Sequence, residues 1–287
     1  MVDQSARPRI AVVTDSSAYP PSDLVAQYGI RVVPLILLMG DDSWRDGVDI
    51  DPPAFYELLR TSEHFPKSSQ PSVSTFEELF VELSQDMDGI VAILLSEELS
   101  GTLDSARAAA ANLPDIPLEI LDSRGCSMMT GFPVLAAAKA AAAGGDLKTV
   151  ARAARDLIGR IHMIFIVDTL EYLHRGGRIG TASKLLGSAL GIRPILEVKD
   201  GFVQPVTKVR TRHKALSILF ELVDERLVRG STSHMAVFNV AAPEEATRLA
   251  DQLEARFHPV EMIQTECSPV MGAHSGPGMV GVVFYCD

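Results

Sequence analysis

The chain has 287 residues, of which 47% are hydrophobic and 22% are charged, a composition typical of a globular protein long enough for two domains. Its 26 Lys and Arg residues against 37 Asp and Glu residues give a formal net charge of −11, which argues against general binding to nucleic acids or to anionic membrane surfaces. The three cysteines are odd in number and widely spaced, so we expect free thiols, with neither a disulfide framework nor a metal site.

The beginning of the chain has no apolar segment typical of a secretion signal. The longest apolar runs, such as residues 32–39, are far shorter than the roughly 20 residues that a membrane-spanning helix needs. We therefore expect a cytoplasmic protein without a stable membrane anchor.

The first half of the chain alternates between strand-like and helix-like segments. Short apolar runs predict strands at 9–17, 30–40, 89–96 and 118–123. Helices are predicted at 21–29, 51–62, 74–87, 102–113, 132–146 and 147–160, and Ser74 and Glu77 have the spacing of a capping box. Strands that alternate with helices and carry few polar residues predict a parallel sheet covered on both faces.

The pattern changes near residue 165. Asp200-Gly201 separates two β-like runs in 193–210 and predicts a hairpin. A short helix is expected at 181–191, longer helices at 213–228 and 243–257, and strands at 234–241, 260–267 and 279–286. The whole chain is thus predicted to form two α/β domains, residues 1–165 with a mostly parallel sheet and residues 166–287 with a mixed sheet.

Several short stretches carry residues suited to binding an anion. The segment "LSGT" at 99–102 follows a strand and begins a helix, so Ser100, Gly101 and the free amides of the helix could hold a negative charge. A plain helix cap is an equally good interpretation. The loops "TDSS" at 14–17 and "SSQPS" at 68–72 offer hydroxyls, but taken alone they look like ordinary turns.

Two basic stretches are less specific. Arg178 lies between glycines in "GGRIG", which could present its guanidinium at a crevice, although a solvated arginine in a turn is commoner. The cluster "KVRTRHK" at 208–214 could meet phosphate or an acidic partner, and the commoner interpretation is a solvated helix start.

The most unusual segment is "MGAHSGPGMVG" at 271–281. Its glycines suggest uncommon backbone angles or a close approach of the backbone to a ligand. His274 can donate, accept or act as a base, and Ser275 adds a hydroxyl. We expect a loop here that faces a ligand.

The sequence contains none of the common nucleotide-binding, serine-hydrolase or zinc-protease motifs. The candidate positions share Arg, His, Ser, Thr and Gly, which bind an anion well. Among them we identify no combination of nucleophile, base and orienting residue that would form a catalytic site.

Taken in order, "TDSS", "SSQPS", "LSGT", "DSR" (122–124), "YLHRGGRI" (172–179), "KDGFVQPVTKVR" and "GAHSGPG" closely resemble the DegV family of bacterial fatty-acid-binding proteins, from about residue 10 to the end. The resemblance implies a carrier that buries one long-chain fatty acid between two domains and is not itself an enzyme. It also implies a partner, a separate ATP-dependent fatty-acid kinase subunit that forms the acyl phosphate for phospholipid metabolism. No cofactor is implied besides the bound acid.

The same resemblance assigns roles to individual residues. Ser68, Ser100 with Gly101, and His274 with Ser275 match positions around the fatty-acid carboxylate, and no catalytic residue or metal ligand is implied. Arg178 and Arg210 match positions linked to phosphate handling or to docking of the kinase. Serine stands where the family often has threonine at Ser68 and Ser275, which keeps the hydroxyl and removes a methyl group.

Two other functions remain open at this point. A hydrolase or transferase acting on a lipid or phosphorylated metabolite could use Asp15, Ser100 and His274, and would turn over substrate without a partner. A regulatory protein could use the basic cluster, and would bind DNA in a salt-sensitive way. The sequence does not predict the length or unsaturation of the acyl chain, the oligomeric state or the residues around the acyl tail. Candidates for the tail wall, which would fit the protein core equally well, are Phe165, Leu185, Leu186 and Leu190.

Overall fold

The computed structural model describes residues 8–187 and 191–287. Its N-terminal half contains a four-stranded sheet in the order β2-β1-β6-β7, in which all pairs are parallel. The strands β1 and β6 are buried along their whole length, as their apolar sequences predict. The four strands are β1 (Ile10–Asp15), β2 (Arg31–Val33), β6 (Gly89–Leu94) and β7 (Leu118–Asp122).

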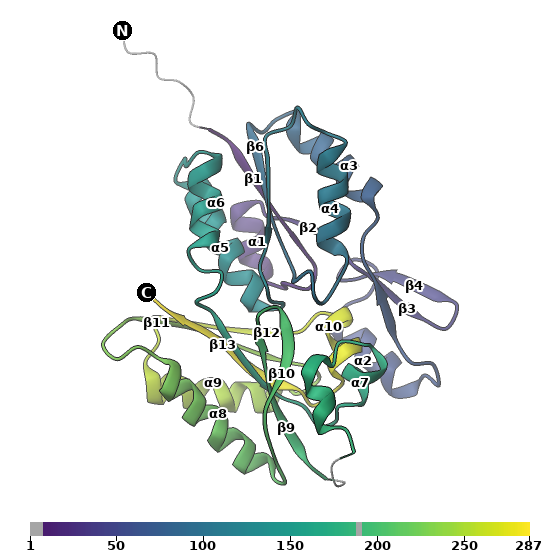
Figure 1. Cartoon of the computed structure of the whole chain (residues 1–287), viewed down its shortest axis with the longest axis vertical. Helices are drawn as coiled ribbons and strands as arrows, with labels where there is room; N and C mark the ends of the chain where they lie inside the picture. Colours follow the sequence, from purple (N-terminus) through teal and green to yellow (C-terminus); the bar gives the residue numbers. More distant parts are fainter. Residues whose placement is uncertain (1–7, 188–190) are drawn as a thin grey trace.

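Helices cover both faces of this sheet (Figure 1). Phe76, Phe80 and Leu103 lie in the core between the sheet and α3 and α4. Phe132, Leu135 and Val150 lie in the core on the opposite face, below α5 and α6. The helices are α1 (Ser22–Tyr28), α3 (Val73–Ser84), α4 (Thr102–Ala111), α5 (Met128–Ala142) and α6 (Leu147–Arg155).

Two predicted helix starts were wrong. Helix α3 begins before the predicted capping box, because the Ser72 hydroxyl accepts from the Thr75 amide at 3.1 Å. Helix α5 begins at Met128, four residues before the predicted start.

A three-stranded antiparallel sheet projects from this half in the order β4-β3-β5. The segment 30–40 was predicted as one strand, but it divides into β2 and β3, which belong to different sheets. Pro34 lies at the division, where its missing N–H cannot continue a ladder. The predicted loop at 68–72 also begins within a strand. The elements are β3 (Ile36–Met39), β4 (Asp42–Arg45), β5 (Lys67–Ser69) and the neighbouring α2 (Pro52–Thr61).

The C-terminal half is built on a six-stranded mixed sheet in the order β10-β9-β8-β13-β11-β12. The pair β11–β12 is parallel and the other pairs are antiparallel. The predicted hairpin at Asp200-Gly201 is present between β9 and β10. The strands are β8 (His162–Ile166), β9 (Arg193–Lys199), β10 (Phe202–Val209), β11 (Ser233–Asn239), β12 (Glu261–Glu266) and β13 (Val280–Cys286).

Helices α8 and α9 pack on one face of this sheet (Figure 1). The other face joins the core below α5, so apolar side chains run without a break from one half of the molecule to the other. The helix predicted at 181–191 is instead a short 3-10 helix at Gly180–Leu185, and residues 188–190 lie outside the described part. The remaining helices are α7 (Glu171–Arg175), α8 (Arg212–Arg226), α9 (Pro243–Phe257) and α10 (Pro269–Ser275).

The α/β class and the two sheets agree with the prediction. The division into residues 1–165 and 166–287 stays a proposal, and strand pairing favours a slightly earlier division. Strand β8 ends at Ile166 and pairs with β9 and β13, so the link at 156–161 separates the two main sheets more naturally.

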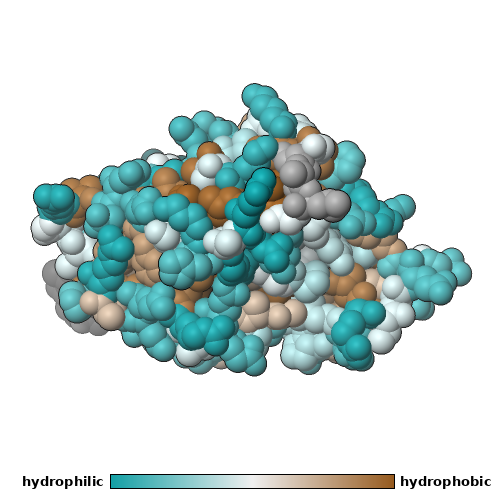
Figure 2. All heavy atoms as spheres, turned by 90° about the horizontal axis from the view of Figure 1, so that it is seen from below, coloured by the Kyte–Doolittle hydropathy of each residue, from teal (hydrophilic) through white to brown (hydrophobic). Residues whose placement is uncertain are grey.

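The surface of the C-terminal half seen in Figure 2 is mixed, with apolar side chains interrupted by hydrophilic ones. Among the residues that the structure describes, no helix is long and apolar enough to cross a bilayer. The predicted cytoplasmic location stays a prediction.

Candidate functional site

A cavity that is partly open to solvent lies between the two halves. Small-molecule sites are mostly apolar with a few placed polar groups, and the lining of this cavity has that composition. The N-terminal half contributes Ser17, Leu35, Ser68, Leu95, Leu99, Ser100 and Cys126. The C-terminal half contributes Met163, Phe165, Leu173, Arg178, Val198, Val203, Val270, Met271, His274, Ser275 and Met279.

The polar part of the cavity centres on a contact between two residues 206 positions apart. The Ser68 Oγ and the His274 Nε2 are 2.6 Å apart. Ser68 is the central residue of β5, and its strand is held in place by pairing with Leu37 of β3. His274 lies in the last turn of α10, which contacts both β5 and α7.

Residues 271–275, which were predicted as a loop, form most of α10. Ser268 caps this helix by accepting from the Met271 amide at 3.4 Å, and Pro269 occupies its first turn, where a missing N–H costs nothing. The glycine-rich part that follows does need unusual angles, with φ of 77° at Gly276 and 84° at Gly278. His274 is therefore presented by a short capped helix and not by a free loop.

Contacts from the N-terminal half fix the position of α10. The Asp46 carboxylate is buried, and it accepts from the Ser16 hydroxyl at 2.6 Å and from the Val270 amide at 3.3 Å. The Tyr56 hydroxyl donates to the Cys267 carbonyl at 2.8 Å. Burial raises the pKa of Asp46 to about 6. Sequence reasoning missed Asp46, because an aspartate in the segment 41–51 has several acidic neighbours and no motif.

The imidazole of His274 is neutral at pH 7. Burial, with a smaller contribution from the positive charge of Arg178, lowers its pKa to about 4. The Nδ1 is buried and has no hydrogen-bond partner among the described residues. A Cβ on Gly176 would lie 2.3 Å from this nitrogen, so the glycine is what leaves space for the ring.

The predicted anion site at the start of α4 contributes hydroxyls. The Ser100 and Thr102 hydroxyl oxygens are 2.9 Å apart, and Ser100 lines the cavity. Gly101 lies next to Ser100 but is not among the lining residues; a Cβ there would come within 2.6 Å of the Gln70 side chain. Gly101 at the cap position gives no side-chain hydrogen bond, but the Thr102 amide donates to the Ser100 hydroxyl at 3.3 Å. The dipole at the start of α4 still favours an anion beside Ser100.

Ser275 also lines the cavity, but its hydroxyl donates to the Met271 carbonyl at 2.8 Å. Its donor is therefore already used within α10. This geometry makes Ser275 a weaker candidate for a head group than Ser68 or Ser100.

The two arginines predicted to contact phosphate or a partner, Arg178 and Arg210, lie in different places. Arg178 is half-buried at the cavity, where its Nε donates to the Leu99 carbonyl at 2.9 Å and its Nη1 to the Gly176 carbonyl at 2.7 Å. Burial lowers its pKa from the ordinary value, and the group stays charged. Arg210 lies outside the cavity lining, in the bend before α8.

Another residue of the basic cluster at 208–214, Arg212, has a structural role. Arg212 forms a paired contact with the Glu245 carboxylate at 2.7 and 3.0 Å, and it donates to the Gly278 carbonyl at 2.8 Å. Arg212 therefore holds the glycine-rich turn after α10 and does not face a ligand.

The three groups proposed for an enzymatic alternative do not converge. Asp15 is fully buried outside the cavity lining, and its carboxylate accepts from the Ser17 amide, the Ser17 hydroxyl and the Leu95 amide. It serves the turn after β1, and its neighbour Ser17 is the residue of that turn that reaches the cavity.

Among the tail-wall candidates, Phe165 lines the cavity, whereas Leu185 and Leu186 do not, and Leu190 lies outside the described residues. Cys126 and Met163 line it and were not recognised from the sequence.

Cys126 and Cys267 are buried free thiols, and Cys286 is a half-buried one. Within the part of the chain that the structure covers, no group of three His, Cys, Asp or Glu residues could hold a metal ion.

Comparisons with known proteins agree with this architecture. A family model described as "Uncharacterised protein, DegV family" matches residues 9–287. A DegV domain-containing protein of Streptomyces coelicolor is 39% identical over 276 residues, which cover 96% of this chain and 97% of that relative.

Two solved structures share the fold closely. One, from Thermus thermophilus, is described as "Fatty Acid Binding of a DegV family Protein"; it is 31% identical, has a TM-score of 0.92, and the match covers 97% of this chain and 100% of that one. The other, from Bacillus subtilis, is described as DegV, a fatty acid binding protein; it is 32% identical, has a TM-score of 0.90, and the match covers 98% and 100%.

Proposed function

The chain belongs to the DegV family, and from this premise we propose that it binds one long-chain fatty acid in the cavity between its two halves. The observation that carries the proposal is the composition of this cavity, which is apolar over most of its wall and also includes Ser100 and the contacting pair Ser68 and His274. The fatty-acid binding of the two solved relatives supports the same function.

The energetics of a buried acyl chain suit such a cavity. A tail of about 15 methylenes, at about 0.8 kcal/mol each, gains roughly 12 kcal/mol before the costs of association. The carboxylate cannot be buried without hydrogen-bond donors. In our proposal the Ser68 and Ser100 hydroxyls, the His274 ring and the charge of Arg178 satisfy it.

Replacement of the head-group hydroxyl tests the binding step. We expect Ser68→Ala to weaken fatty-acid binding by about 10- to 100-fold, since a hydrogen bond to a charged group contributes about 1.5–3 kcal/mol. Titration of the delipidated protein with oleate measures the loss. Ser69→Ala is the matched control, because Ser69 is the next residue of β5, is exposed and lies outside the cavity lining. Equal affinity of Ser68→Ala and wild-type protein would contradict this assignment.

We further propose that the protein presents the bound carboxylate to a separate ATP-dependent kinase, and is not the enzyme itself. The neutral His274 beside Ser68 supports a role at the head group. Arg210 is exposed before the start of α8, which supports contact with a partner, and Arg178 lines the cavity, which supports a role at the head group. In this proposal the protein works in the cytoplasm and supplies acyl phosphate for phospholipid synthesis.

A reconstituted assay with the kinase subunit and ATP separates presentation from binding. At saturating fatty acid we expect His274→Ala to reduce acyl-phosphate formation more than it reduces fatty-acid affinity. Unchanged formation by this variant would remove His274 from the presentation step. Turnover of a lipid or a phosphorylated metabolite without any partner would instead favour the enzymatic alternative.

A further inference from the structure

A second hollow, open to solvent, lies beside the cavity wall formed by β8, β9 and the start of α5 and shares Val198 with the cavity. Its apolar lining includes Met129, Ile161 and Val198. Its rim carries exposed Arg124 and Lys199, so it is a polar surface groove and not a continuation of the apolar interior.

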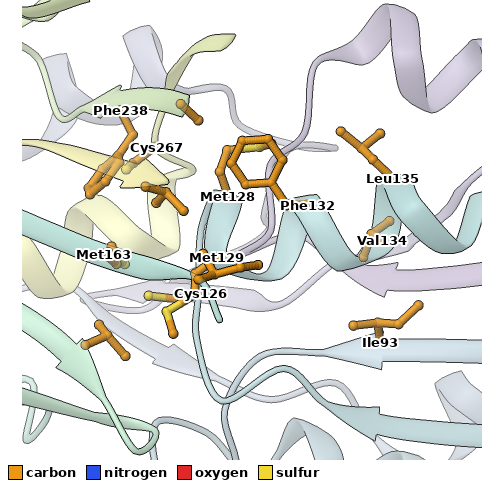
Figure 3. Close-up of a cluster of buried hydrophobic side chains, with 14 of the residues drawn as sticks. Ile93, Cys126, Met128, Met129, Phe132, Val134, Leu135, Met163, Phe238 and Cys267 are labelled. Atoms are coloured by element: carbon orange, nitrogen blue, oxygen red, sulfur yellow. The ribbon is translucent and has the colours of Figure 1, made fainter. Parts of the chain in front are cut away.

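The wall between the cavity and this groove is thin. Val198 lines both spaces, and it pairs directly across the sheet with Met163, which lines the cavity. Cys126 lines the cavity and Met129 lines the groove, although the two belong to one turn in which the Met129 amide donates to the Cys126 carbonyl at 3.1 Å. Figure 3 shows Met129 and Cys126 together, with Met163 beside them.

The Met129 side chain fills the gap in this wall by lying against Gly125. A Cβ on Gly125 would be 2.4 Å from the Met129 Cγ, so the absence of a side chain at Gly125 creates the position that Met129 occupies. Met129 is only 6% exposed, although the groove lies beside it. An unbranched thioether with several rotatable bonds can change its rotamer more easily than the β-branched Val198.

We propose that Met129 closes the tail end of the acyl cavity and thereby sets the length of fatty acid that the protein prefers. This inference rests on the proposed function. Each added methylene that stays within the apolar cavity increases affinity about fourfold. A chain that reaches Met129 must displace it and enter the polar groove, where further methylenes gain much less. Affinity therefore rises with chain length up to this residue and then stops rising.

Shortening this side chain tests the inference. Met129→Ala removes three heavy atoms from the wall, which is the space of about three chain carbons. We expect the preferred length among saturated acids from dodecanoate to docosanoate to increase by about two to four carbons, measured by competition on the delipidated full-length protein. Met129→Val shortens the side chain less and is expected to shift the preference by one or two carbons, so it provides the test if the alanine variant does not fold.

Met128→Ala is the matched control. Met128 is the preceding residue of the same helix, it is fully buried in the same core, and it lines neither space. We expect this variant to lose stability without a change in preferred length. The inference is overturned if Met129 variants keep the wild-type preference, or if Met128→Ala shifts it equally. Failure of the wild-type protein to bind any of these acids would instead overturn the proposed function.

Discussion

The contact between Ser68 and His274 is the smallest unit on which the proposed site depends. The two atoms are 2.6 Å apart, and burial keeps the imidazole neutral at pH 7. Both properties depend on the backbone of Gly176, since any side chain there would occupy the place of the ring.

Gly176→Ala tests this dependence. The backbone of Gly176 has an ordinary φ of −77°, so the expected effect comes from the added Cβ, which would lie 2.3 Å from the His274 Nδ1 and 2.9 Å from the Tyr172 carbonyl. We expect fatty-acid affinity to fall at least about tenfold, as for loss of one hydrogen bond to a charged group. Gly177→Asn is the control, because a Cβ on Gly177 would meet no atom within 4 Å and asparagine tolerates its φ of 72°. Equal losses in the two variants would argue against a specific effect on the ring.

The lowered pKa of His274 predicts a pH effect on the ligand-free protein. Because its pKa is about 4 in the folded state and about 6.5 when unfolded, the unfolded state takes up the proton first as the pH falls. This residue therefore makes the free energy of unfolding decrease between pH 6.5 and 4, by up to about 3 kcal/mol. His274→Gln, which cannot take up this proton, is expected to show a smaller decrease in urea titrations across that range. Parallel profiles for both proteins would contradict the assigned pKa.

At the scale of elements, α10 connects the two halves of the molecule. It belongs to the C-terminal half by sequence, and it packs beside α2 and α7 (Figure 1). Its first turn is held by the buried Asp46 of the N-terminal half, and its last turn carries His274. The position of His274 thus depends in part on this buried carboxylate.

Asp46→Ala is expected to lower both stability and fatty-acid affinity. The Ser16 hydroxyl and the Val270 amide would lose their acceptor inside the protein, at a cost of about 1–3 kcal/mol. The raised pKa of Asp46, about 6, makes its stabilising contribution grow as the pH falls from 6 to 3.8. The cost of the substitution is therefore expected to be about 1 kcal/mol larger at pH 5 than at pH 8. The exposed Asp41 in the turn before β4 provides a control substitution to alanine. A cost that is independent of pH would contradict this account of Asp46.

The sequence predicted those elements whose formation depends on neighbouring residues, and it missed those that depend on contacts between distant segments. The buried strands β1 and β6 and the helices α2, α4 and α9 have apolar patterns and ends that are visible in consecutive residues. The division of 30–40 into two strands was missed, because its two parts pair with different sheets. The helix α10 was missed because glycines in it serve close packing, as at Gly272 against Tyr56, and only those after it have positive φ.

At the scale of the whole molecule, the cavity exists because the two halves share one core. The hairpin between β9 and β10 contacts the N-terminal sheet, where the Ser96 hydroxyl donates to the Gly201 carbonyl at 3.0 Å. Val198 and Val203, on either side of this hairpin, then form part of the cavity wall. Such walls come from residues far apart in the chain, which is why the motifs indicated Ser68, Ser100 and His274 but gave no sign of Cys126 or Met163.

The central claim, that one long-chain fatty acid occupies this cavity, is tested most directly by its contents. The purified protein would be denatured and extracted with organic solvent, and the extract quantified by mass spectrometry. We predict long-chain fatty acid near one molecule per chain, and a clear reduction for Ser68→Ala prepared in the same way. An empty extract from wild-type protein that also takes up no added palmitate or oleate would contradict the claim.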